Sequence, residues 1–143
     1  MTATQGFVGI GTQLLRGDGA SPEQFGLIAE CKDITMGGKS VEFVDMTHQE
    51  SDGEYREYKP TFKNSGDLNV KYNYIGSNAS QDALEDDFEN KTLRNFKIVA
   101  PNSESSTWAF AAYVMNVGVS FPLNGPVEAN ITLRITGPIT KTP

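Results

Sequence analysis

Alternation of apolar and polar residues is the clearest pattern in this chain. It runs without interruption from residue 127 to residue 136, and a second alternating stretch extends from Trp108 to Leu123. Successive side chains of a β-strand point to opposite faces, so the apolar residues of the first stretch share one buried face. These residues are Val127, Ala129, Ile131, Leu133 and Ile135. The pattern predicts long strands, whose unpaired edges favour association with other sheets.

Shorter segments extend this prediction to most of the chain. Strands are expected over residues 7–15, 24–35, 40–46, 68–75 and 95–100, followed by the long ones over 107–123 and 127–137. The sequence Met36-Gly37-Gly38-Lys39 contains two adjacent glycines, which supply the positive φ of a tight turn. We therefore expect a β-hairpin between residues 24–35 and 40–46.

One segment departs from the β pattern. Residues 77–89 contain no proline or glycine and place Leu84 and Phe88 four positions apart, which predicts a helix over about residues 78–91 that docks on the sheet through both side chains. Asn78 is a suitable N-cap, and Gln81 stands three residues later, as a capping box requires. The expected fold class is mainly β: an antiparallel β-sandwich or barrel with one flanking α-helix.

The length of 143 residues fits a single domain over residues 1–143. The two ends, residues 1–5 and 138–143, are rich in Thr and Pro and are expected to be flexible arms. From residue 47 to residue 57 the chain is polar and acidic, and Tyr55 is the one large apolar side chain available to anchor it. We therefore expect a mobile acidic loop over residues 45–58.

Composition narrows the function classes. The chain has 18 acidic and 12 basic residues, and its formal net charge of −6 would repel nucleic acid. A single cysteine excludes an intramolecular disulfide framework, and no apolar stretch is visible that would serve secretion or membrane insertion. The expected partners include no membrane, and the expected compartment is a reducing cytoplasm.

Candidate chemical sites are weak throughout the chain. His48 is the sole histidine, and one imidazole among scattered carboxylates does not make a metal site. Cys31 has no third group implied beside it and His48, so a structural thiol is expected. The glycine-rich residues 6–11 lack the Lys-Ser/Thr of a phosphate loop. We predict no catalytic, cofactor-binding or metal-binding residue, and we do not expect an enzyme.

Two further clusters have structural interpretations. The carboxylates between Asp82 and Glu89 have spacings that could serve acid–base work or calcium, but a solvated helix face explains them better. Trp108, Phe110 and Tyr113 could stack on bases, but no Lys or Arg lies among them, so they are expected in the core.

An ordered series of short motifs carries a resemblance. They are Gly9-Ile-Gly11-Thr12-x-Leu14, Ile28-Ala29-Glu30-Cys31-Lys32-Asp33-Ile34-Thr35-Met36-Gly37-Gly38, Val41-Glu42-Phe43-Val44-Asp45-Met46-Thr47, Tyr55-Arg56-Glu57-Tyr58, Ser65-Gly66-Asp67 and Ile135-Thr136-Gly137-Pro138-Ile139. As a set, from about Gly6 to Ile139, the chain resembles the major tail tube proteins of long, non-contractile-tailed (siphovirus-type) phages, whose fold is similar to that of type VI secretion tube proteins.

The resemblance implies a structural virion protein without a cofactor. Its subunits would join as hexameric rings, and the rings would stack into the hollow phage tail tube through which DNA is ejected without specific binding. The implied partners are further copies of the chain and other tail proteins, such as the tape measure, tail terminator and distal tail proteins. The implied location is the virion tail, assembled in the host cytoplasm.

The resemblance also implies an assembly role for the loop over residues 45–58. Its candidate ring-stacking residues are Asp45, His48, Glu50, Asp52, Glu54, Tyr55, Arg56 and Tyr58. A competing hypothesis from another class is a stand-alone carbohydrate- or peptide-binding β-sandwich, in which Trp108 and the tyrosines would form a stacking platform. Filament formation at high concentration favours the tube protein, whereas a stable glycan-binding monomer favours the rival.

Overall fold

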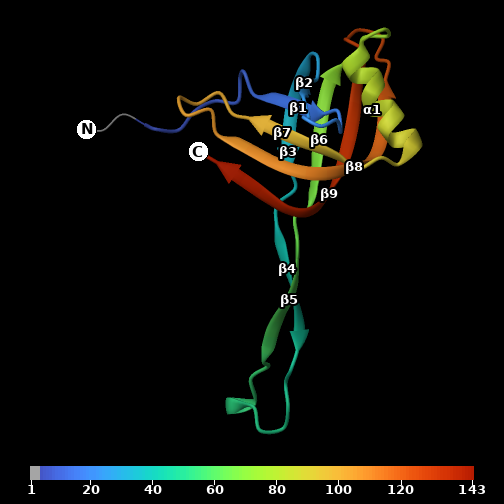
Figure 1. Cartoon of the computed structure of the whole chain (residues 1–143). Helices are drawn as coiled ribbons and strands as arrows, with labels where there is room; N and C mark the ends of the chain where they lie inside the picture. Colours follow the sequence, from blue (N-terminus) through green and yellow to red (C-terminus); the bar gives the residue numbers. More distant parts are fainter. Residues whose placement is uncertain (1–3) are drawn as a thin grey trace.

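The computed structural model describes residues 4–143 and has, within that range, a β-rich body and a long two-stranded projection (Figure 1). The elements, in chain order, are β1 (Gln13–Gly17), β2 (Phe25–Leu27), β3 (Cys31–Met36), β4 (Ser40–Asp45), the 3-10 turn η1 (Asp52–Glu54), β5 (Tyr58–Asn64), β6 (Asp67–Asn73), α1 (Ala79–Asn90), β7 (Arg94–Val99), β8 (Thr107–Ser120) and β9 (Glu128–Thr142).

The body is a single antiparallel sheet of seven strands in the order β2-β1-β7-β8-β9-β6-β3. Its long central strands β8 and β9 curve strongly, and α1 lies against the β8 side (Figure 1). The order ends in two different strands, β2 and β3, so the sheet is not a closed barrel. The predicted class, a mainly antiparallel β fold with one flanking helix, is confirmed in its sandwich-like form.

Alternation along β9 produces the core at four of the five predicted positions, whereas Val127 precedes the strand and is half-buried. Ala129, Ile131, Leu133 and Ile135 are buried, and the polar residues between them are exposed or half-buried. Each buried residue of β9 pairs with a core residue of β6 or β8; for example, Ile131 stands opposite Val70. Two register shifts, near Phe110 and Met115, accompany the bend of the β8–β9 ladder.

The predicted helix is present as α1, and Asn78 caps it. The Asn78 side-chain oxygen accepts hydrogen bonds from the backbone N–H of Ser80 and of Gln81, at 3.0 and 3.3 Å. The expected capping box is not formed, because the buried Gln81 side chain faces the sheet. It accepts from the N–H of Ile75 and donates to the carbonyls of Ala29 and Asn73. Gln81 thereby fixes the start of the helix to the body.

A second buried polar contact holds the other end of α1. The Asp87 carboxylate accepts from Arg16 Nε at 2.5 Å and from Arg94 Nε at 3.1 Å, and its side chain is almost fully buried. The hydrogen bond to Asp87 raises the pKa of the Arg16 guanidinium. The prediction of a solvated face from Asp82 to Glu89 is therefore wrong at Asp87, because two strand arginines compensate the buried charge.

The docking prediction for the helix is half right. Leu84 is 1% exposed and belongs to the core, whereas Phe88 is 40% exposed. The physical reason lies one residue earlier, because Asp87 and its two arginines occupy the space between the helix and the sheet at this end. Tyr113, expected in the core, is likewise exposed on the outer face of β8.

Several predicted boundaries change. The strand expected over 7–15 begins only at Gln13, because a turn closed by the Thr12 N–H and the Gly9 carbonyl precedes it. The prediction of a flexible C-terminal tail over residues 138–143 is wrong, since residues 138–142 are the end of β9 and residues 140–142 pair with β8. The arm expected over residues 1–5 begins outside the described residues.

The hairpin predicted through Gly37 and Gly38 is also wrong. β3 pairs with β6, and β4 pairs with β5, so residues 37–39 lead out of the body instead of reversing the chain. The glycines serve a close crossing at the root of the projection. A Cβ on Gly66, whose φ is +88°, would lie 2.4 Å from the Gly38 carbonyl oxygen. At this crossing the Gly37 N–H donates to the Asp67 carbonyl.

We expect Leu84→Ala to lower the free energy of unfolding by about 2–5 kcal/mol, because it leaves a cavity between α1 and the sheet. Phe88→Ala is the matched control on the same helix, and it should cost clearly less, since much of that ring is already in water. Denaturant midpoints at constant m-value measure both. Equal losses in the two variants would contradict this packing.

We expect Gly66→Ala to destabilise the chain by more than about 1 kcal/mol, because alanine disfavours the positive φ and its methyl group meets the Gly38 carbonyl. Gly76→Ala is the control, since a Cβ there has no atom within 4 Å. Thermal unfolding followed by circular dichroism should separate the two variants. Identical melting curves would show that the crossing tolerates a side chain.

Candidate assembly surfaces

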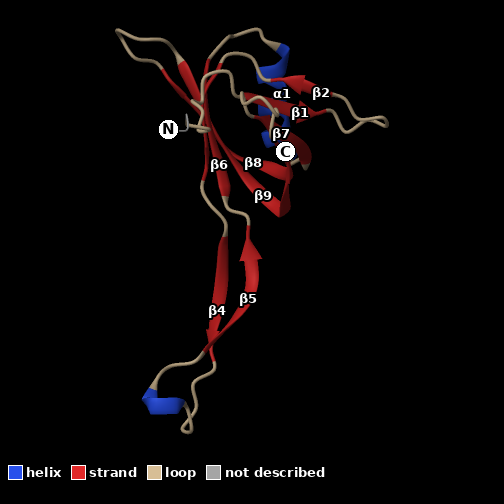
Figure 2. Cartoon of the chain, turned by 90° about the vertical axis from the view of Figure 1, so that its left-hand side faces the viewer, coloured by secondary structure: helices blue, strands red, loops and turns tan. Residues whose placement is uncertain are grey.

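The two-stranded projection, hereafter the arm, comprises β4, β5 and the tip loop between them. Figure 2 shows it extending away from the body as an isolated ribbon. Asp45 pairs with Tyr58 at the tip end and Ser40 with Asn64 at the root. Every residue of both strands is exposed. An isolated two-stranded hairpin is marginally stable in water, so the arm is expected to gain stability from a partner.

Large apolar side chains are concentrated on this arm. Phe43 is 63% exposed and Phe62 is 78% exposed. The other exposed apolar side chains of the arm are Val41, Val44, Met46, Tyr55 and Tyr58. Phe43 and Val44 are adjacent in a strand and so point to opposite faces. Both faces of the arm are therefore apolar, and contiguous exposed apolar surface of this kind marks a contact site.

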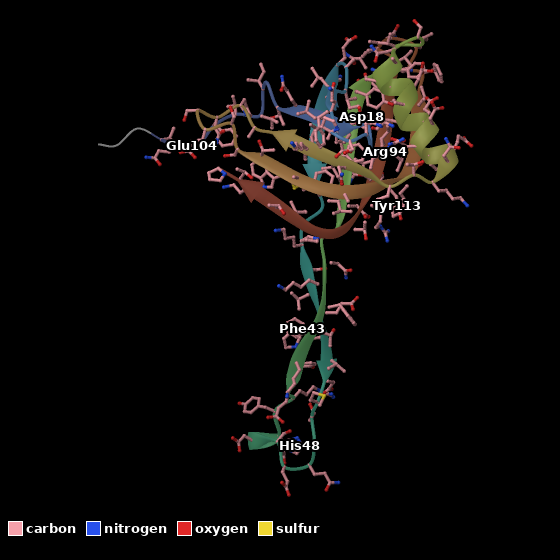
Figure 3. The ribbon with its side chains drawn as sticks, in the orientation of Figure 1. Asp18, Phe43, His48, Arg94, Glu104 and Tyr113 are labelled. Atoms are coloured by element: carbon pink, nitrogen blue, oxygen red, sulfur yellow. The ribbon has the colours of Figure 1, made fainter. Side chains whose placement is uncertain are left out.

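The tip loop is held by its own polar groups. The Met46 N–H donates to the Glu57 carbonyl at 2.8 Å. Ser51 Oγ donates to Glu57 Oε2 at 2.7 Å and lies 3.2 Å from His48 Nδ1, and His48 Nδ1 lies 3.2 Å from Glu57 Oε2. Figure 3 shows His48 at the far end of the arm and Phe43 midway along it.

Asp45 accepts a second group of hydrogen bonds at the tip of the arm. Its carboxylate accepts from the Thr47 N–H at 2.8 Å and from Arg56 at 3.0 Å. Hydrogen bonds from Thr47, with a smaller contribution from Arg56, hold the pKa of the Asp45 carboxyl below its usual value. The carboxylate is therefore charged at neutral pH, and it organises the base of the loop.

The structure brings the sequence-predicted loop residues together at the tip of the arm. Asp45 and Tyr58 form the last strand pair, Asp52 and Glu54 lie in η1, and Arg56 returns to Asp45. Tyr55 is exposed and does not anchor the loop within its own chain. The sequence reasoning missed Phe43 and Phe62, since it treated residues 40–46 as part of the body and assigned no strand to residues 58–64. Their apolar character beside a polar loop was the available signal.

Two other regions expose apolar side chains. One is the N-terminal segment before β1, with Phe7, Val8 and Ile10. The other is the β8–β9 loop, residues 121–127, with Phe121 and Leu123. In both regions these side chains are more than half exposed, as Phe43 and Phe62 of the arm are.

No group of three or more His, Cys, Asp or Glu side chains within residues 4–143 is placed to hold a metal ion. Cys31 is half-buried, and burial raises the pKa of its thiol to about 11, which suits a structural thiol. None of the helical segments within the same range is long and apolar enough to cross a bilayer.

The aromatic platform of the competing hypothesis is not assembled. Trp108 faces inward on β8 and packs against the core, whereas Tyr113 points outward on the same strand. Tyr72 is buried, Tyr55 follows η1 in the tip loop, and Tyr58 begins β5 of the arm. A β-rich body with exposed apolar regions on an arm and on loops defines a protein that associates through its surface, rather than one with an enclosed binding site.

Comparison with known proteins identifies the class. The family model of the lambda phage tail tube protein matches residues 12–141, so the chain belongs to that family. It is a structural protein of the phage tail tube. No sequence among the curated proteins matches it significantly.

Solved structures share the fold at low sequence identity. A chain of the tail of the empty gene transfer agent particle, refined with C6 symmetry, has 16% identity and a TM-score of 0.70 over 92% of this chain and 96% of that chain. The SPP1 tail tube has 20% identity and a TM-score of 0.67 over 91% and 75%. The anti-feeding prophage baseplate, 6-fold symmetrised, has 10% identity and a TM-score of 0.72 over 98% and 97%.

Proposed function

We propose that this chain builds the tail tube as hexameric rings, stacked so that the arm of each subunit contacts the neighbouring ring. Family membership supports the tube, and the six-fold symmetry of the structurally similar tail and baseplate supports the hexamer. Head-to-tail contacts that close on rotation give rings, and those that do not close give an open stack of rings. The two end strands of the body sheet, β2 and β3, are available for contacts within a ring.

The arm is the observation that carries this proposal. It presents apolar side chains on both faces, and every residue of its two strands is exposed. Ordering a backbone costs roughly 1–2 kcal/mol per residue, so a projection of this length is favourable only where it buries its apolar side chains. A second ring supplies that surface. Asp45, His48, Glu50, Asp52, Glu54, Tyr55, Arg56 and Tyr58 would then make the stacking contacts at the tip.

The net charge of the chain is consistent with passage of DNA through the proposed tube. A subunit of net charge −6 would line a tube through which DNA passes without sticking. The protein would act structurally and not as an enzyme, with assembly in the host cytoplasm. At the two ends of the tube its partners would be other tail proteins, including the terminator and distal tail proteins, and the tape measure protein would lie within.

We expect deletion of Gln49–Glu54 to leave the subunit folded and to block stacking of rings into tubes, because it removes the tip while sparing the β4–β5 ladder. Negative-stain microscopy and sedimentation measure tube formation, and circular dichroism measures folding. The control removes the same number of exposed acids elsewhere, in the variant Asp86→Asn/Glu89→Gln/Glu104→Gln. That variant should form tubes as the wild type does, whereas tubes from the deletion variant would contradict the role of the tip.

Hydrogen exchange gives a second measure of the same loop. We expect amides of residues 47–57 to exchange rapidly in the free subunit, because the loop is surface-exposed, and to become protected in tubes, where a neighbour covers it. Amides of β9 serve as the internal reference, since its ladder with β6 and β8 is formed in both states. Equal protection of the loop in subunits and tubes would contradict an assembly role.

A further inference from the structure

The two ends of the body carry surfaces that match each other. The β8–β9 loop, residues 121–127, lies at the end of the body opposite the arm (Figures 1 and 2). Leu123 is 97% exposed and Phe121 is 74% exposed. This loop contains no charged residue. Its base is fixed, because the Tyr74 N–H donates to the Val127 carbonyl at 2.9 Å.

A groove lies at the other end, where the arm leaves the body. Its volume is about 1000 Å³, and its apolar lining comes from Val41 and Phe62 of the arm and from Ile135, Pro138 and Ile139 of β9. The groove exists because β9 bends at Gly137, whose φ is +80°, and Ser65 Oγ holds the bend by donating to the Gly137 carbonyl. Its volume suffices for one or two large apolar side chains.

Charge is complementary between the two ends. Lys39 and Lys63 line the groove at the arm root together with one carboxylate, Glu42, so the charged lining is positive by one. Glu30 lies near the base of the opposite loop, because its carbonyl accepts from the N–H of Asn73, and the N–H of the next residue, Tyr74, donates to Val127. The Glu30 side chain is exposed. Opposed charges of this kind fix the register of an interface more than its affinity.

We propose that Phe121 and Leu123 of one copy insert into the arm-root groove of the copy in the adjacent ring. This inference rests on the stacked tube proposed above and names a ring-to-ring contact separate from the arm tip. A head-to-tail stack places the arm end of each subunit against the loop end of the next, so groove and loop meet in every step. Because Phe62, Lys63 and Asn64 of β5 already line the groove, residues 58–61 of that strand extend about 13 Å beyond it, and the tip loop extends farther. The tip therefore reaches a different part of the neighbour.

A disulfide cross-link tests the contact directly. In a Cys31→Ser background, the double variant Leu123→Cys/Pro138→Cys is assembled into tubes and oxidised. Because each chain carries one cysteine in the loop and one in the groove, the expected product is a ladder of dimers, trimers and longer chains on a non-reducing gel. The control Leu123→Cys/Ser103→Cys moves the second cysteine to the exposed β7–β8 turn and should give no ladder.

A second variant tests the energetic role of the loop. Leu123→Lys places a cation against Lys39 and Lys63 and should lower the yield of tubes at least tenfold. Leu123→Met, which keeps an apolar side chain, should assemble normally. Leu123 is fully exposed, so neither change disturbs the fold. Tubes of the Leu123→Cys/Pro138→Cys variant that give no ladder on oxidation, or Leu123→Lys tubes in normal yield, would overturn this contact and leave the proposed tube standing. A wild-type chain that forms no tube under any condition would overturn both.

Discussion

The structure depends on the ladder between β8 and β9, because β9 pairs with β8 on one side and with β6 on the other and so joins the two halves of the sheet. Its buried row from Ala129 to Ile135 forms the centre of the core. The same strand begins at the exposed β8–β9 loop and bends at Gly137 beside the arm root. One strand therefore sets both the packing of the subunit and the separation between its two end surfaces.

The helix is held against this sheet by buried polar contacts, whereas the arm extends away from it. α1 is tied down at one end by Gln81, which satisfies three backbone groups, and at the other by Asp87 with Arg16 and Arg94. Removing either side chain would leave buried polar groups without partners, which costs more than the bonds themselves contribute. The arm has no comparable anchors beyond its glycine crossing, and its apolar side chains face water. The body is thus complete in one copy, whereas the arm is not.

Sequence patterns predicted what local periodicity determines. The alternation of β9, the N-cap at Asn78 and the burial of Leu84 each depend on neighbours a few residues away, and each was confirmed. Predictions that required long-range pairing were wrong. Gly37 and Gly38 were predicted to form a hairpin turn between neighbouring strands, but β3 pairs with β6 instead. Asp87 was predicted to be solvated, because its partners Arg16 and Arg94 are not adjacent to it in the sequence. The tip residues were found as a group, whereas Phe43 and Phe62 were missed because exposure is not visible in an apolar pattern.

The marginal stability of an isolated hairpin has a functional consequence. If the arm packed firmly on its own body, its apolar residues would already be buried in the free subunit, and their burial would contribute no free energy to assembly. Because the glycine crossing directs the arm away from the sheet, Phe43, Phe62 and their neighbours would be buried in the proposed tube only when a second copy is present. Folding of the body and assembly of the tube would thereby be separate steps. The Asp45–Arg56 ion pair and the hydrogen bond from the Met46 N–H to the Glu57 carbonyl hold the register at the end of the arm, where a slip of one residue in either strand would exchange its two faces.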